Sequence, residues 1–251
     1  MAQMTTEEFG DAMERGAWLL VPLGTTEEHG AHLPLGTDTM ITEYVCQEVA
    51  RRSGAVVAPV LPYGLCRTTR NFPGTISVGF ATVEAIVREV LAECVRHGAR
   101  RIAVISGHAG AGHLEAVRVA GQRLVEEVPG LLLLVMGPDD LPLPALPETP
   151  PGMADGHGGV METSVLLAIH PDRVRAGRLA PARGGAFPPG RVLAHPEEVF
   201  PSGILGDPTR ASAQAGVAVL DHIVPVIVEM LAQAIASTSD GADRMVGEPP
   251  A

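Results

Sequence analysis

The first 136 residues alternate between apolar runs and segments in which apolar residues recur at helical spacing. Four runs are apolar almost throughout and predict strands over residues 17–23, 55–61, 101–106 and 131–136. The segments between them predict helices over residues 39–52, 82–97 and 113–128. Strands without polar alternation are typical of a parallel sheet that is buried on both faces. The pattern therefore predicts an α/β fold, in three layers, with a mainly parallel sheet and helices on both faces.

Short helical signals lie at both ends of this core. Thr5 and Glu8 are placed as a capping box at the start of a short amino-terminal helix. Helical spacing returns over residues 160–170 and again over residues 209–236, with Pro225 as a point where the last helix could be interrupted.

Two segments are rich in proline and glycine. Residues 138–159 predict a long loop, and loops of that length in compact domains often carry function. Residues 178–206 predict an irregular excursion. Because no repeat or compositional break divides the chain, we expect one domain over residues 1–236 and a disordered tail over residues 237–251.

Composition narrows the class of protein. The chain has 251 residues, of which 46% are hydrophobic, and this is ample for one buried core. A net charge of −11 argues against a nucleic-acid surface, and without an apolar run of membrane length or a leader-like start we expect no membrane partner and a cytoplasmic location. Three widely spaced cysteines, Cys46, Cys66 and Cys94, predict reduced thiols; a reactive thiol at Cys66 is the less favoured alternative.

Polar and ionisable residues gather in three segments, each beyond the carboxyl end of a predicted strand. The segments are residues 27–38 (EEHGAHLPLGTD), 106–113 (SGHAGAGH) and 155–162 (DGHGGVME). Open α/β sheets bind their ligands at this edge, so segments that are distant in sequence can converge on one crevice. We therefore expect one site rather than a set of unrelated histidines.

The residue types in the first segment suit a metal. Glu27 and His29 are two apart, and on an extended chain they point to the same side, while Asp38 lies where the next helix begins. Carboxylate oxygen and imidazole together favour Zn²⁺, Mn²⁺ or Fe²⁺ over Ca²⁺. A solvated polar loop is the alternative for this segment. A phosphate cradle is the alternative for residues 106–113, but their spacing is G-x-x-G-x-G and no P-loop lysine follows.

Five motifs occur in the order found in the creatininase (creatinine amidohydrolase) family, which this sequence resembles over about residues 17–220. They are residues 27–38, 72–77 (FPGTIS), 107–110 (GHAG), 158–164 (GGVMETS) and 206–208 (GDP). The resemblance implies a creatininase-like α/β/α fold, a two-metal hydrolase centre and a homo-oligomer, most often a hexamer.

The resemblance also implies a ligand set. Glu27 and His108 would bind one metal, His29 the other, and Asp38 would bridge the two. Creatinine-hydrolysing members take a further glutamate from the position that is Gly110 in this chain, so that ligand is missing here. Glu162 is the candidate replacement. Its alternative is an acid that merely favours the start of a helix.

Other residues concern proton transfer and substrate. His157 matches a histidine that the family uses for proton transfer, with a structural hydrogen bond as the alternative. His32 is placed to orient the loop or a ligand, and His113 is more simply structural. Creatinine-hydrolysing members use tryptophans around residues 138–159, whereas the single tryptophan here is Trp18. An aromatic clamp for creatinine is therefore not evident.

The prediction is a divalent-metal-dependent amidohydrolase with two metal ions per subunit (Zn, Mn or Fe). It would cleave a non-peptide C–N bond, of a cyclic or linear amide, through a metal-bridging hydroxide. Relatives imply creatinine-like lactams, formamides or short peptides as substrates, and the sequence does not choose among them. The alternative is a metal-stabilised binding or scaffold protein that has lost catalysis, which the changed residues at Gly110, Ser106 and Ala111 favour slightly.

Overall fold

The computed structural model describes residues 1–149, 154–184, 188 and 190–244, and side chains through residue 237. Four parallel strands form one sheet in the order β2-β1-β3-β4. Their bounds are β1 Leu19–Leu23, β2 Val56–Val57, β3 Arg101–Ser106 and β4 Leu132–Met136. The central strands β1 and β3 pair over their whole lengths, from Leu19 opposite Ile102 to Leu23 opposite Ser106. Their carboxyl ends therefore lie side by side.

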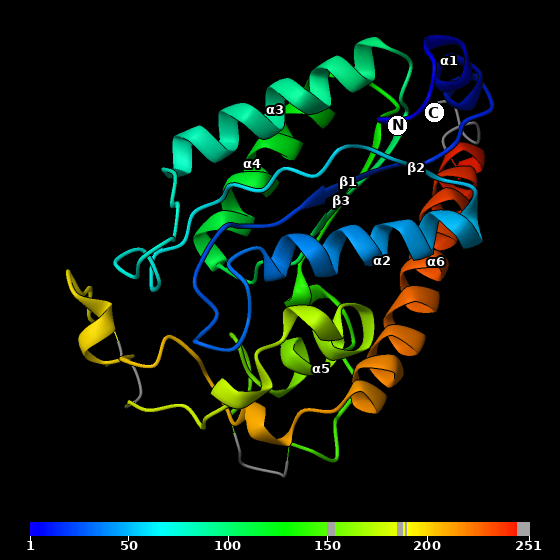
Figure 1. Ribbon diagram of the computed structural model, residues 1–251. Helices are drawn as coiled ribbons and strands as arrows, with labels where there is room; N and C mark the ends of the chain where they lie inside the picture. The colour runs from blue at the N-terminus through cyan, green and yellow to red at the C-terminus, as the bar shows by residue number, and fades with distance from the viewer. Residues whose placement is uncertain (150–153, 185–187, 189, 245–251) are drawn as a thin grey trace.

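Helices cover both faces of the sheet, as the sequence predicts (Figure 1). One face carries α1 Thr6–Glu14, α3 Phe80–Arg96 and α4 Ala111–Glu127. The other face carries α2 Thr37–Ser53, α5 Val160–Ile169 and α6 Ala213–Arg244. Alternate residues of the central strands enter the two cores: Leu19 and Ile102 pack under α3 and α4, whereas Leu20 and Ala103 pack under α2 and α6. Burial on both faces explains why these strands read as continuous apolar runs.

Local signals in the sequence account for several element ends. The capping box of α1 forms as predicted: Thr5 Oγ1 accepts from the backbone N–H of Glu8, and the Glu8 carboxylate accepts from that of Thr5 at 2.7 Å. Helix α2 ends at Gly54, whose φ of 73° is a left-handed conformation that glycine adopts at little cost.

Two elements differ from the prediction. The strand expected over residues 55–61 is only β2, Val56–Val57, with one further bridge between Leu23 and Leu61. It lies at the sheet edge, and the ladder slips after Ala58. The Ala58 N–H donates to the Leu20 carbonyl, but the Pro22 carbonyl accepts from Leu61, three residues on, so one extra residue interrupts the regular pairing. The terminal helix is not interrupted at Pro225. Pro225 and Asp221 are both exposed, so water can satisfy the carbonyl that the proline leaves without a donor.

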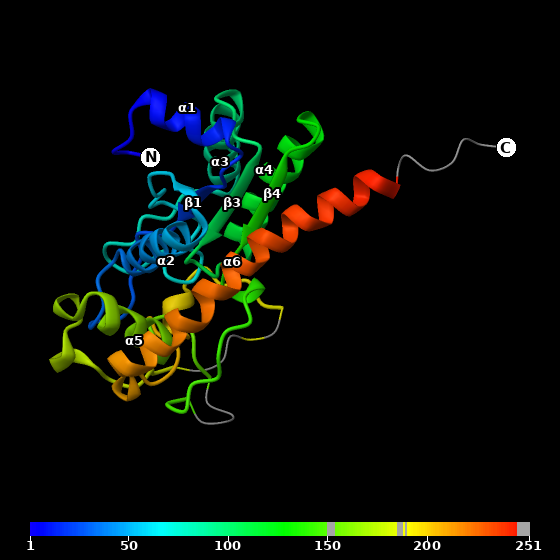
Figure 2. The ribbon, with the colours of Figure 1, turned by 90° about the vertical axis from the view of Figure 1, so that its right-hand side faces the viewer.

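Helix α6 also begins later and runs further than expected, through Arg244. Over Ala213–Ser237 it is long and apolar enough to match a membrane span, but its buried face packs on α2 and α5 as part of the core (Figure 2). The single domain through residue 236 and the disordered tail from residue 237 stay predictions, and residues 245–251 lie outside the described part.

Irregular segments follow the sheet. The loop over residues 138–159 contains a 3-10 turn, η1 Pro138–Asp140, within its described part. Four further 3-10 turns connect α5 to α6: η2 Pro171–Arg173, η3 Ala176–Arg178, η4 Pro196–Glu198 and η5 Pro208–Arg210. The stretch over residues 178–206 therefore passes over the carboxyl edge of the sheet largely without regular structure, as predicted.

The packing of α5 on α6 generates a stability prediction. A methyl group at Gly216 of α6 would overlap the Ser164 carbonyl of α5. We expect Gly216→Ala to lower the free energy of unfolding by about 1–3 kcal/mol, as overpacking does, measured by urea unfolding. Gly10→Ala in α1 is the matched control, because nothing lies within 4 Å of its added methyl and alanine suits a helix interior. Equal stability of the two variants would contradict this account of the interface.

Candidate metal centre

The carboxyl ends of β1 and β3 meet the first turn of α2, and this contact positions the acids of the site. A methyl at Gly24, just after β1, would lie 2.6 Å from the backbone nitrogen of Thr39. One at Gly107, just after β3, would lie 2.6 Å from the carbonyl oxygen of Asp38. Two glycines therefore let both strand ends approach α2 closely, and Asp38 lies between the loops that carry Glu27 and His108.

Asp38 contacts a histidine through each of its oxygens. Its Oδ1 lies 3.0 Å from His29 Nε2, and its Oδ2 lies 3.4 Å from His108 Nδ1. Thr25 Oγ1 donates a further short hydrogen bond to Oδ2. The carboxylate is almost fully buried. This two-sided contact is what a bridging ligand requires.

In each of these two histidines one ring nitrogen donates to a backbone carbonyl, and this bond fixes which nitrogen faces the acids. His29 Nδ1–H donates to the Glu27 carbonyl at 3.1 Å, and His108 Nε2–H donates to the Leu65 carbonyl at 3.1 Å. These bonds leave Nε2 of His29 and Nδ1 of His108 to face the carboxylates. Outer hydrogen bonds of this kind orient histidine ligands in metalloproteins.

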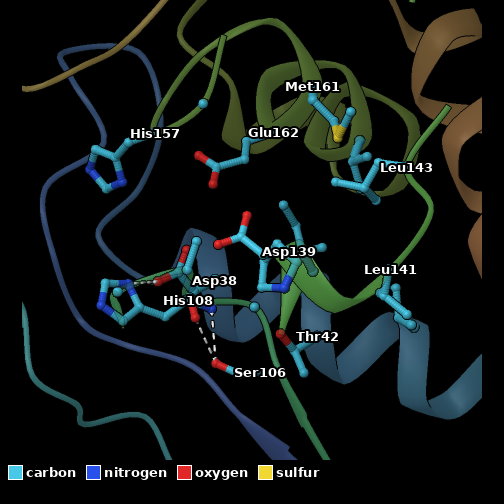
Figure 3. Close-up of a pocket in the computed structure, with 18 of the residues that line it drawn as sticks. Asp38, Thr42, Ser106, His108, Asp139, Leu141, Leu143, His157, Met161 and Glu162 are labelled. Atoms are coloured by element: carbon cyan, nitrogen blue, oxygen red, sulfur yellow. Dashed lines mark hydrogen bonds and ion pairs between the residues drawn. The ribbon is translucent and has the colours of Figure 1, made fainter. Parts of the chain in front are cut away.

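Glu27 and Glu162 complete two groups around Asp38. Glu27 Oε1 lies 2.6 Å from His108 Nδ1, and Glu162 Oε2 lies 3.6 Å from His29 Nε2. Candidate ligand atoms of His29, Asp38 and Glu162 all lie within 4.8 Å of one another, as do those of Glu27, Cys66 and His108. The structure thus brings together all five predicted ligands, and Figure 3 shows three of them with His157 on one side of a chamber. Whether each one binds metal stays a prediction.

The donor set tests whether a metal fits. Two buried carboxylates, Glu27 and Asp38, and the half-buried Glu162 lie beside two imidazoles, and a buried carboxylate is costly unless positive charge lies against it. Hard oxygen and imidazole nitrogen at this density match the ligand chemistry of zinc, manganese and iron. Two divalent cations would compensate the three negative charges, so the residues present fit the group.

Glu162 has a second contact that bears on its role. Its Oε2 accepts from the backbone N–H of Gly158 at 2.6 Å, just before the first turn of α5. Both alternatives from the sequence therefore have geometric support, because the same carboxylate faces His29 and caps a helix. At Gly110, by contrast, an added Cβ would overlap the His108 ring.

His157 lies against the site through two contacts. Its Nε2–H donates to the Glu28 carbonyl at 2.6 Å, and its ring centroid lies 4.2 Å from that of His29. Burial and the neighbouring His29 both disfavour its charged form, but the Glu28 carboxylate, 3.4 Å from Nε2, together with Glu162 and Glu27 outweighs them and raises the pKa of His157. The bond to Glu28 is a structural one, and it leaves Nδ1 as the nitrogen that could transfer a proton.

The two remaining histidines of these loops are held neutral. His32 Nε2 lies 3.0 Å from Thr163 Oγ1, so it ties the first loop to α5. Burial lowers the pKa of His32 to about 4. His113 Nδ1 accepts from the Leu65 N–H, and burial followed by repulsion from His108 lowers its pKa to about 4. Both therefore have structural contacts behind the site.

Sequence reasoning missed the residues that support the acids. Thr25 and Thr69 are buried beside the Glu27 carboxylate. Thr69 Oγ1 donates a short hydrogen bond to it, and Thr25 Oγ1, whose one hydrogen is shared with Asp38, lies 3.0 Å from Glu27 Oε1. Cys66 is also buried near Glu27 and His108, and burial raises the pKa of its thiol, as does the Glu27 charge. A reactive thiol at Cys66 is therefore not favoured. Threonine in a turn carries no sequence signal of such a role.

The four other histidines do not join the cluster within the described residues. His97, His195 and His222 are exposed, and His170 is half-buried at the end of α5.

Charge pairing sets the protonation of the metal-free site. Burial disfavours the imidazolium of His29, but Asp38 outweighs it and raises the pKa of His29 to about 10. Burial likewise opposes a charged His108, yet Asp38 and Glu27 hold its pKa well above the ordinary value. Burial would also raise the pKa of Asp38, but His29 holds it well below the usual range. The protonated imidazoles thus supply the positive charge where cations would lie.

A family model and curated relatives match this chain over most of its length. The creatininase model, described as creatinine amidohydrolase, matches residues 2–231. The creatinine amidohydrolase of Pseudomonas putida is 31% identical over 253 residues, which cover 94% of this chain and 95% of that protein. The mycofactocin precursor peptide peptidase of Mycolicibacterium smegmatis is 36% identical over 218 residues, covering 82% and 81%.

Solved structures are similar in fold and include metal-bearing forms. One described as creatininase Mn has a TM-score of 0.83 at 30% identity and covers 93% of this chain and 97% of its own. A single-residue creatininase variant described as of Zn-Zn type has a TM-score of 0.82 at 29% identity and covers 93% and 96%.

The protonation state leads to a test of metal uptake. A histidine ligand must be unprotonated, whereas His29 keeps its proton up to about pH 10 in the metal-free protein. We expect binding of Zn²⁺ at pH 7 to release on the order of two protons per two metals, and the apparent affinity to rise with pH. Calorimetry in buffers of different ionisation enthalpy measures this release, and His29→Gln should release about one proton fewer. A binding enthalpy that does not depend on the buffer would contradict the charge pairing.

Proposed function

The chain belongs to the creatininase family, and from this premise we propose that it is a divalent-metal-dependent amidohydrolase that cleaves a non-peptide C–N bond in a cyclic or linear amide. The observation that carries the proposal is the convergence of five candidate ligand side chains, four buried and one half-buried, from three segments of the chain: Glu27, His29, Asp38, His108 and Glu162. A protein that only binds a partner has no need of this set at the wall of a chamber. The inactive scaffold remains the alternative that the experiments below separate.

The proposed ligand assignment follows the contacts. Glu27 and His108 would hold one cation, and His29 with Glu162 the other, while Asp38 contacts both histidines and would be shared. Structures of relatives described with Mn and with Zn-Zn support two sites that accept either metal. Bound cations would supply Lewis-acid chemistry, which lowers the pKa of a water and polarises the amide carbonyl.

The chain's own residues orient the ligands and supply the proton. Thr25 and Thr69 fix the Glu27 carboxylate through hydrogen bonds, so the acid is preorganised before substrate arrives. His157 lines the same chamber and is fixed by its bond to the Glu28 carbonyl. Its raised pKa favours the imidazolium, which can protonate the departing nitrogen from Nδ1.

Substrate class, assembly and location rest on the family resemblance and the sequence. A small-molecule amide or a short peptide is the expected substrate class, in line with relatives named for creatinine and for a precursor peptide. A homo-oligomer, most often a hexamer, and a cytoplasmic location stay predictions from the sequence.

The shared ligand gives the sharpest test of the function. We expect the wild-type chain to hold two metals and to hydrolyse at least one amide in a panel of lactams, formamides and aminoacyl anilides. Asp38→Asn should lose at least one metal and nearly all turnover, because a neutral amide no longer offsets the repulsion between two cations. Metal analysis with the same panel measures both, and circular dichroism checks the fold.

Asp11→Asn on α1, exposed and distant from the chamber, is the matched control. Two metals and normal turnover in Asp38→Asn would contradict the dinuclear centre, and one metal without turnover in wild type would favour the scaffold.

Glu162 can be tested separately as a ligand and as a helix-end acid. We expect Glu162→Gln to weaken the metal that His29 binds, while the Glu27–His108 site stays filled. Asp155→Asn is the control, because Asp155 accepts from the N–H groups of Val160 and Met161 and caps the same helix. Asp155→Asn should lower the free energy of unfolding by about 0.3–1 kcal/mol and leave metal affinity unchanged. If Glu162→Gln behaves as this control does, Glu162 is not a ligand and the second metal takes its acid elsewhere.

A further inference from the structure

The five candidate ligands lie at one wall of a chamber whose other walls are apolar. The chamber has a volume of about 470 Å³. Its apolar walls come from α2, α5, α6 and the loop after β4: Ile41, Val45, Leu141, Leu143, Met161, Val165, Val219 and Ile223. Figure 3 shows Leu141, Leu143 and Met161 on the side away from His108 and His157. The volume falls in the range of about 300–1,000 Å³ that suits a ligand much larger than one small polar ring.

Nearly all the charged side chains that line this chamber have hydrogen-bond or ion-pair partners. Glu27, Asp38 and Glu162 face the histidines, and the Asp155 carboxylate accepts hydrogen bonds from the first turn of α5. Among the described residues, no arginine lines the chamber. Asp139 is the exception, since its exposed carboxylate has neither a hydrogen bond nor an ion pair within the described part of the chain.

The turn that carries Asp139 is fixed by its neighbour. Asp140 accepts from Arg118 at 2.7 Å and from the backbone N–H of Gly137 at 2.8 Å, which closes the 3-10 turn after β4. With Asp140 bonded outward, the Asp139 carboxylate points into the chamber, toward the side where Asp38 and Glu162 lie (Figure 3). A free carboxylate beside an apolar cavity is complementary to a ligand that combines an alkyl or aryl group with a positive charge.

We propose that the substrate is a linear amide whose acyl part carries an apolar side chain and a primary ammonium group, with the side chain in the leucine-lined chamber and the ammonium on Asp139. This inference rests on the proposed amidohydrolase function and names its substrate class. In the reaction the acyl C–N bond breaks, water supplies the oxygen that joins the acyl carbon, and the nitrogen leaves with a proton. The products are an amino acid and an amine. Amides of leucine and phenylalanine have this form, whereas creatinine offers only an N-methyl group and a formamide has only hydrogen on its acyl carbon.

Binding alone tests this recognition without requiring turnover. We expect hexylamine to bind the metal-loaded protein more tightly than either hexan-1-ol or ethylamine, measured by calorimetry at pH 7. Asp139→Asn should reduce the ratio of the affinity for hexylamine to that for hexan-1-ol by about threefold or more, as expected for an ion pair partly screened by solvent. Leu143→Asn should reduce the advantage over ethylamine, and its side chain is 37% exposed, so the fold should tolerate the change. Asp11→Asn, with the same loss of charge on α1, should bind all three as wild type does.

Hydrolysis then tests the substrate class. Leucine p-nitroanilide should be cleaved with a higher kcat/KM than glycine p-nitroanilide, by roughly fourfold per buried methylene. The kcat/KM for leucine p-nitroanilide should also exceed the values for N-acetyl-leucine p-nitroanilide and for creatinine. Asp139→Asn should reduce the difference in kcat/KM between leucine p-nitroanilide and its N-acetylated form.

The outcomes separate this inference from the function on which it rests. Equal binding of hexylamine and hexan-1-ol would overturn the ammonium site, and equal binding of hexylamine and ethylamine would overturn the apolar one. Faster cleavage of creatinine or of a formamide would overturn the substrate class while the amidohydrolase function stands. Selective binding of hexylamine by a protein that holds two metals and cleaves no amide would overturn the function and leave the ligand preference in place.

Discussion

The electrostatic pairing of Asp38 with His29 and His108 is the interaction on which the rest of the site depends. A carboxylate this deeply buried is tolerated only when positive charge and hydrogen-bond donors surround it. The loops after β1 and β3 supply those groups, and they can reach Asp38 because glycine stands at the two points of closest approach. The arrangement is costly to the apoprotein unless the imidazoles stay protonated, which makes it well suited to exchange protons for metal.

The sheet explains why the site lies where it does. β1 and β3 are central, parallel and paired along their whole lengths, so the loops that follow them emerge together at one edge. The loop that precedes α5 carries His157, the first turn of α5 carries Glu162, and together they close over that edge from the α2 and α6 side. One wall of the chamber is therefore polar because it consists of strand ends and loops, and the other walls are apolar because they belong to helices that also form the core.

Much of this arrangement could be predicted from the sequence, because the signals are local and strong. Apolar runs without alternation predicted the parallel sheet, and the polar segments beyond three strand ends predicted one crevice, which the structure brings together. The edge strand was overestimated, because apolar composition over residues 55–61 does not reveal that one extra residue interrupts the ladder between Ala58 and Leu61. Thr25, Thr69 and the outward turn of Asp140 could not be predicted, since their roles arise from contacts between segments that are far apart in the chain. Which side chains meet there depends on how the loops fold against one another, and not on residue type.

The close approach of Gly110 to His108 has a consequence for how such sites diverge. The family resemblance implies an acid at the position of Gly110 in creatinine-hydrolysing members, but in this chain even a methyl group there would overlap the ring of His108, which faces Glu27. An acid at that position therefore requires the His108 ring to turn or shift. A carboxylate supplied from the start of α5 and one supplied beside His108 thus call for two different placements of the same imidazole. A change from one arrangement to the other would move a candidate metal ligand together with the acid.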